Sequence, residues 1–153
     1  MRPLLATVLV AALAIPGTAL ADDVVLPPLV PKSGTENKDV ANVTALISSE
    51  LDWLGEVDRV AIIAQAPAAL NLACLDKAAC LSGIDKGESG SHVFAGSLRM
   101  TSSAVTLDLV YYNVQTGRFV RRKSFELENR PEVIADSMGP IVRAMVTGEV
   151  PED

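Results

Sequence analysis

Apolar and polar positions change their spacing several times along this chain of 153 residues. Between residues 37 and 55, apolar side chains recur at every third or fourth position, which predicts an amphipathic helix. These apolar positions are Val40, Val43, Ile47, Leu51 and Leu54. Asn37 is a candidate cap for the start of this helix, and Gly55 is expected to end it.

Two apolar runs in the first half of the chain predict strands of different kinds. The run at residues 24–29 contains Pro27 and Pro28. Because proline lacks the N–H donor that a strand ladder needs, we expect a short edge strand there. Residues 57–64 include the compact apolar run at 60–63. Such a run is typical of a strand that is buried on both faces.

Three further strands are predicted at His92–Met100, 104–114 and 119–127. Apolar and polar residues alternate in the second of them, which is the pattern of a sheet with one drier face. Residues 115–117 between the last two strands predict a hairpin turn, in which Gly117 can adopt the left-handed conformation.

A final helix is predicted to begin at Pro131, because apolar side chains again follow a helical stripe. They are Ile134, Met138, Ile141 and Met145. The complete order predicts a single-domain α/β sandwich, with a mixed, mainly five-stranded sheet packed against about three helices. We expect this domain to span residues 22–148 and to be followed by an acidic tail at residues 149–153.

The amino terminus has the features of a cleaved signal peptide at residues 1–21. Arg2 precedes an apolar run at residues 4–15, and Ala19 and Ala21 provide the small side chains of a cleavage site. A membrane anchor is the alternative, but the run is shorter than the roughly 20 residues that span a bilayer. Asp22, not cysteine, follows the site, so we expect a periplasmic or secreted protein that is not a lipoprotein and keeps no transmembrane anchor.

Cys74 and Cys80 are the two cysteines of the chain, and an oxidising compartment favours a disulfide between them. Six residues of continuous helix rise about 9 Å, which exceeds the roughly 7 Å limit between bridged Cα atoms. The chain must therefore turn between them, and Asp76 is placed to cap a new helix. A metal pair lacks further ligands besides His92, and a redox pair would have two intervening residues.

The charge of the chain limits its partners. The formal net charge of −6 becomes −7 when the signal peptide removes Arg2, which opposes binding to nucleic acid or to anionic membranes. Four basic residues nevertheless gather on one predicted strand, namely Arg118, Arg121, Arg122 and Lys123. They could form a partner surface, or they could protect an edge strand from aggregation.

An enzyme is the alternative function, and it would have to use His92 and its neighbouring serines. We expect His92 to be a solvated residue at the start of a strand. No nucleophile elbow surrounds Ser91, and the glycine-rich segment at residues 83–90 lacks the spacing of a phosphate loop and a lysine at the position that the loop requires. The sequence therefore predicts no catalytic, cofactor-binding or metal-binding residues.

Several features together resemble a known family. They are the opening run at residues 25–29, the cysteine pair, the run at residues 93–98 and the hairpin at Thr116 and Gly117. The chain resembles the amino-terminal domain of TolB, the related domain of the curli secretion lipoprotein, and similar exported proteins of Gram-negative bacteria. The resemblance implies an α/β fold, an envelope location and no catalytic residue. The resulting hypothesis is a non-enzymatic periplasmic or envelope domain that engages another protein. The alternative is a small exported enzyme, or an accessory protein of an enzyme, that uses the His92 region.

Overall fold

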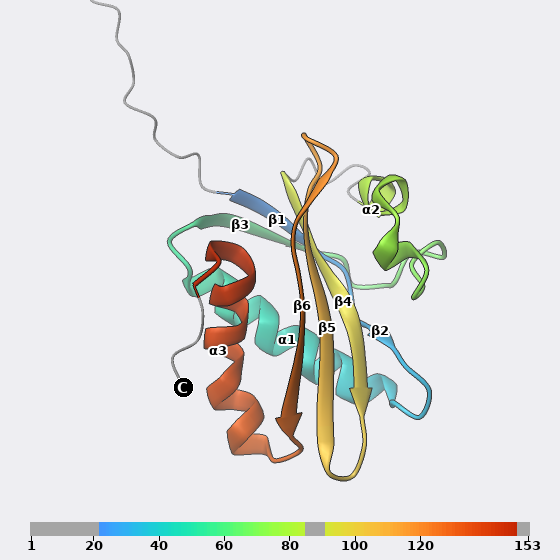
Figure 1. The fold of residues 1–153 in the computed structure, drawn as a ribbon, viewed down its shortest axis with the longest axis vertical. Helices are drawn as coiled ribbons and strands as arrows, with labels where there is room; N and C mark the ends of the chain where they lie inside the picture. The colour runs from blue at the N-terminus through green and yellow to red at the C-terminus, as the bar shows by residue number, and fades with distance from the viewer. Residues whose placement is uncertain (1–21, 85–90, 150–153) are drawn as a thin grey trace, which may run out of the picture.

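A mixed sheet with helices on both faces forms the described part of this computed structural model (Figure 1). The structure describes residues 22–84 and 91–149. The predicted signal peptide at residues 1–21 lies outside the described residues, as does the predicted acidic tail beyond Glu149. Among the described helices, none combines the length and the apolar character that crossing a membrane would need.

Among the described residues six strands make up the sheet, and they confirm the predicted α/β class. They are β1 (Asp22–Leu26), β2 (Val30–Pro31), β3 (Val57–Ile62), β4 (His92–Met100), β5 (Ala104–Asn113) and β6 (Arg118–Glu128). Their order is β3-β1-β4-β5-β6, and β2 pairs separately with β4. Pairing is parallel among β1, β2, β3 and β4, whereas β4, β5 and β6 form an antiparallel meander.

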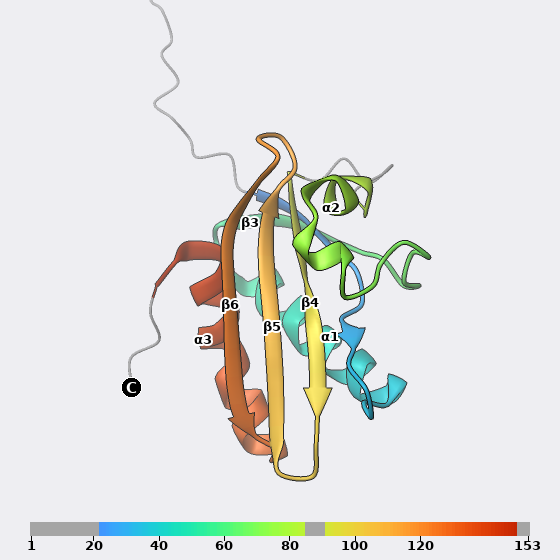
Figure 2. The ribbon, with the colours of Figure 1, turned by 45° about the vertical axis from the view of Figure 1, so that its right-hand side comes forward.

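The helices divide between the two faces of the sheet. The two long helices, α1 (Asn37–Trp53) and α3 (Pro131–Thr147), pack on one face and enclose the larger core. The short helix α2 (Ala78–Ile84) and the 3-10 helix η1 (Cys74–Asp76) lie over the other face, which we call the outer face, and enclose a smaller core. Figure 2 shows the long helices behind the meander and α2 in front of it.

The predicted apolar stripes of the two long helices face the larger core. Val43, Ile47 and Leu51 of α1 are buried there, as are Met138 and Met145 of α3. The details of the caps differ from the prediction. Asp39 and Val40 both donate their backbone N–H groups to the carbonyl of Glu36, so Glu36 takes the cap position and Asn37 is already helical.

The expected roles of the first two long strands are wrong. β1 was expected at an edge but lies between β3 and β4, with Val25 and Leu26 fully buried. Pro27 and Pro28 follow its last residue, so they remove no ladder hydrogen bond. β3 was expected to be buried on both faces but forms an edge, where Ile62 is 59% exposed.

Candidate functional site

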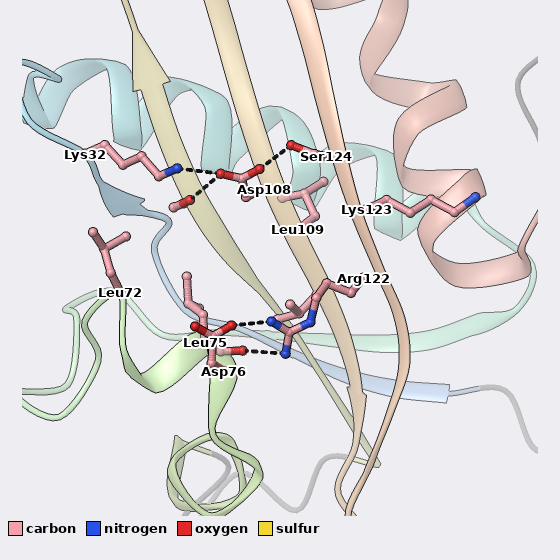
Figure 3. Close-up of a pocket in the computed structure, with 11 residues that line it drawn as sticks. Lys32, Leu72, Leu75, Asp76, Asp108, Leu109, Arg122, Lys123 and Ser124 are labelled. Atoms are coloured by element: carbon pink, nitrogen blue, oxygen red, sulfur yellow. Dashed lines mark hydrogen bonds and ion pairs between the residues drawn. The ribbon is translucent and has the colours of Figure 1, made fainter.

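A groove of about 530 Å³ opens on the outer face of the sheet (Figure 3). Its floor comes from β4, β5 and β6, one wall comes from the segment at residues 72–76, and Lys32 stands at the opposite side beside β2. The side chains that matter most below are Lys32, Leu72, Asp76, Asp108, Val110 and Arg122. The groove thus joins segments that are far apart in the sequence.

The groove follows the boundary between the part of the outer face that η1 and α2 cover and the part that they leave uncovered. Ala95 and Val110 are paired across β4 and β5, and both belong to the smaller core under η1 and α2. Two residues further along the same strands, Ser97 and Asp108 are paired and begin the polar part. A strand repeats its direction every two residues, so these four side chains share one face.

Asp108 is the centre of the polar half of the groove. Its carboxylate accepts hydrogen bonds from Lys32 Nζ at 2.6 Å, from Ser97 Oγ at 3.4 Å and from Ser124 Oγ. The hydrogen bond from Lys32 is the main reason that the pKa of Asp108 lies below its ordinary value of 3.8, and Ser124 adds to it. Asp108 is therefore a weak base whose carboxylate accepts three side-chain hydrogen bonds.

Arg122 closes the other half of the groove by joining β6 to η1. Its guanidinium binds the carboxylate of Asp76 and also donates to the carbonyl oxygen of Leu75 at 3.3 Å. The same guanidinium lies 4.5 Å from the centre of the Phe119 ring, which is a cation–π geometry. These contacts hold the wall of the groove against the edge of the meander.

A disulfide joins Cys74 in this wall segment to Cys80 in α2. The two Cα atoms are 5.3 Å apart, and the chain turns between them, as the spacing predicted. The expected cap at Asp76 is not seen, because α2 begins only at Ala78 and the Asp76 carboxylate binds Arg122 instead.

The four basic residues of β6 do not gather on one surface. Arg121 faces the long helices, where its Nη1 donates to the carbonyl oxygens of Met145 and Val146, each at 2.9 Å, near the end of α3. The side chain of Lys123 extends toward α3 in Figure 3, although Lys123 is one of the residues that line the groove. Arg118 is exposed at the start of the strand and does not line the groove, whereas Arg122 and Lys123 do. The alternation follows from the two-residue period of a strand.

His92 opens β4 as predicted, but the expectation that it is solvated is wrong. It is only 8% exposed because β1 lies against the start of β4 and the Tyr111 ring stacks on it at 4.7 Å. Burial lowers the pKa of His92 below 6.5, and the charge of Asp22 partly offsets this shift. His92 does not line the groove.

The neighbours of His92 do not form a catalytic relay. Ser91 Oγ and Asp22 Oδ1 approach the same ring nitrogen, Nδ1, at 2.8 Å and 3.5 Å. A relay needs the serine and the carboxylate on opposite nitrogens of the ring. Ser91 also bonds to the backbone of Asp23, and Tyr111 donates to Asp22 at 2.8 Å, so this cluster fastens β1 to β4 and β5.

Sequence reasoning missed the pairing of Lys32 with Asp108. A signal for Asp108 was present, because it is the one charged residue of β5. Lys32 carried no such signal, since it lies in a polar stretch 76 residues earlier. Within residues 22–84 and 91–149, histidine, cysteine and acidic side chains form no group of three that could hold a metal ion.

Comparisons with known proteins show the fold. No family model matches the sequence, and no curated protein sequence matches it significantly. TolB from Acinetobacter baumannii has a similar structure, with a TM-score of 0.55 and 13% identity over 86% of this chain. The match spans only 29% of the TolB chain.

For two other similar structures, the match with this chain spans most of their own length. A PelC dodecamer from Paraburkholderia phytofirmans has a TM-score of 0.54 and 14% identity, over 79% of this chain and 87% of the PelC chain. Lipoprotein GNA1162 from Neisseria meningitidis has a TM-score of 0.53 and 13% identity, over 83% of this chain and 96% of the other. At such low identity the likeness concerns the fold alone, and it confirms the expected structural resemblance to TolB.

Proposed function

We propose that this chain is a non-enzymatic domain of the cell envelope, periplasmic or secreted, that binds or helps to assemble another protein through the groove beside Arg122. One observation carries the proposal: four of the charged side chains that line the groove form two ion pairs. Lys32 binds Asp108, and Arg122 binds Asp76. They provide a shaped, polar binding surface and do not converge on a reacting atom.

The chemistry of the groove argues against catalysis. A general base works best when its pKa lies near the working pH, whereas the pKa of Asp108 lies below 3.8. Ser124 donates to this carboxylate, so its hydroxyl is not paired with a base that would activate it at neutral pH. The His92 cluster, which the enzyme alternative requires, is buried away from the groove and has no relay geometry.

The composition of the groove suits a protein partner. Leu72 is 46% exposed at the rim of the groove, which the guanidinium of Arg122 also lines. Interfaces between proteins commonly place an apolar centre beside hydrogen-bonded polar groups, and arginine is enriched where binding energy concentrates. The net negative charge of the chain opposes polyanions as partners.

Three observations support the envelope location. Residues 1–21 have the pattern of a cleaved signal peptide. The bond between Cys74 and Cys80 is of a kind that persists in oxidising compartments. Another protein with this fold, GNA1162, is a lipoprotein. Intact mass of the exported protein tests the location, with a mature chain that begins at Asp22 as the expected result.

A binding measurement with matched variants tests the function. The partner is captured from the envelope by in-cell cross-linking, identified, purified, and titrated against the wild-type protein. Arg122→Ala should weaken binding at least about tenfold, because truncation of an arginine at an interface hot spot costs about 2 kcal/mol or more. Arg118→Ala, on the same strand but outside the groove, should bind as the wild type does. Equal affinities of the two variants would contradict the proposal.

A further inference from the structure

The two edges of the sheet are protected to different degrees. β6 carries charged residues along its whole length and contains an irregularity in its pairing that leaves Val120 without a partner on β5. Charges and bulges of this kind keep edge strands from pairing with other chains. On β3, Asp58 and Arg59 occupy the first half, whereas the second half is Val60, Ala61 and Ile62. The end of β3 therefore lacks the protection that β6 has.

The backbone of β3 also presents hydrogen-bonding groups at its open side. Ile63 donates its N–H to the carbonyl of Leu26 on β1. Neighbouring residues of a strand point their backbone groups in opposite directions, so those of Val60 and Ile62 point away from β1. β3 ends the strand order among the described residues, as Figure 1 shows, and no other described strand pairs with this side.

An apolar groove accompanies this open edge on the face that carries α1. It has a volume of about 560 Å³ and lies between α1, the residues that follow β1, and the end of β3. Leu29, Val40, Ala41, Ala45, Ile62 and Ile63 contribute to it, and no charged residue of the described part of the chain lines it. The surface beside the open edge therefore favours an uncharged, apolar occupant.

We propose that a second copy of this chain occupies the edge, with the two β3 strands antiparallel about a two-fold axis at Ala61. In this register Ala61 faces Ala61 of the second copy, and Val60 faces the second copy's Ile62. The outward backbone groups of Val60 and Ile62 then meet as hydrogen-bonded pairs, which gives about four intermolecular bonds. A two-fold interface of this kind uses the same patch on both copies.

The side chains and charges of β3 fit this register. Val60 and Ile62 project toward the α1 face, since they are paired with Val24 and Leu26 of the larger core. Two copies would therefore place four branched side chains side by side, continuous with both apolar grooves, and such cross-strand pairs are stabilising. Asp58 would face Ala64 of the second copy, so no like charges would be opposed. This edge is separate from the groove at Arg122, so dimerisation and partner binding can be tested independently.

A single introduced cysteine tests the register. The two natural cysteines are bonded to each other, so Ala61→Cys carries the one free thiol of its chain. Cα atoms of a non-hydrogen-bonded antiparallel pair are about 4.5 Å apart, which a disulfide can bridge. Protein purified from cells that express the full chain should form a covalent dimer on a non-reducing gel. Val120→Cys, at an exposed apolar position on the other edge, should stay monomeric.

Sedimentation of the unmodified protein tests the dimer itself. The wild type should shift from monomer toward dimer as its concentration rises to roughly 100 μM, a range in which weak interfaces associate. Ile62→Lys should stay monomeric, because it places charges into the shared apolar cluster, whereas Val120→Lys should behave as the wild type. A wild type that is monomeric throughout, or Ala61→Cys and Val120→Cys cross-linking equally, would overturn the proposal.

Discussion

The guanidinium of Arg122 on β6 binds the carboxylate of Asp76 on η1 across the edge of the groove. The two residues are 46 positions apart, and the contact joins the disulfide-bearing segment to the antiparallel meander. Because Asp76 is largely exposed, the ion pair contributes little to global stability. Its structural effect is local, since it fixes one wall of the groove.

Reduction of the bond between Cys74 and Cys80 should loosen the same wall. A closed loop of this size stabilises a chain by about 2 kcal/mol in the chain-entropy account. Urea unfolding with and without reductant measures the loss, and hydrogen exchange should locate the added mobility at residues 74–84. Identical unfolding midpoints, together with unchanged exchange, would show that the bond does not support the wall.

Arg121 should matter for stability and not for partner binding. Its two charge-assisted hydrogen bonds satisfy carbonyls in the last turn of α3, where a positive charge is favourable. Arg121→Ala should lower the free energy of unfolding by about 1.5–3 kcal/mol. Lys123→Ala on the same face is the control and should change it by less than about 0.5 kcal/mol. Thermal unfolding of both variants distinguishes the outcomes, and equal midpoints would contradict this role of Arg121.

His92 should make stability depend on pH. Its pKa in the folded protein lies below 6.5, mainly because burial disfavours the charged ring beside Tyr111 and Ser91, while Asp22 opposes the shift. The unfolded chain then binds more protons below pH 6.5, so the free energy of unfolding should fall as pH decreases from about 7 to about 5. His92→Gln should flatten this slope in urea unfolding. Parallel slopes for both proteins would be the contrary result.

Gly96 should be intolerant of any side chain. A Cβ atom there would lie 2.4 Å from the carbonyl oxygen of Asp108 and 2.6 Å from a methyl carbon of Leu109, on the paired strand. Gly96→Ala should therefore destabilise the protein by about 1–3 kcal/mol, as overpacking does elsewhere. Gly55→Ala is the matched control, since no atom lies within 4 Å of its Cβ position. A Gly96→Ala protein that unfolds like the Gly55→Ala protein would refute the expected clash.

Local patterns predicted most of the elements but not their neighbours. The stripes of α1 and α3 and the meander were visible because periodicity reports which side of an element is buried. The prediction placed β1 at an edge and β3 inside the sheet, whereas the structure has them the other way round. An apolar run does not reveal how many strands flank it. The burial of His92 was missed for a similar reason, since it depends on Tyr111 and on the start of β1.

The candidate site was only partly visible in the sequence. The compartment and the spacing of Cys74 and Cys80 predicted the bond in its wall. The cluster of basic residues indicated β6 as a possible partner surface. The two-residue period of a strand, however, directs Arg121 and Arg122 to opposite faces of the sheet. The contact between Lys32 and Asp108 depends on how distant segments pack, and local sequence does not report that.

Photo-cross-linking in cells tests the groove most directly. A photoreactive phenylalanine analogue replaces Leu72, which is 46% exposed at the groove, or Trp53, which is 83% exposed at the end of α1. We expect a discrete adduct with one envelope protein from position 72 and none from position 53. Arg122→Ala should abolish the adduct and Arg118→Ala should preserve it. If position 72 gives no adduct, or if both positions capture the same proteins equally, the groove is not the binding site.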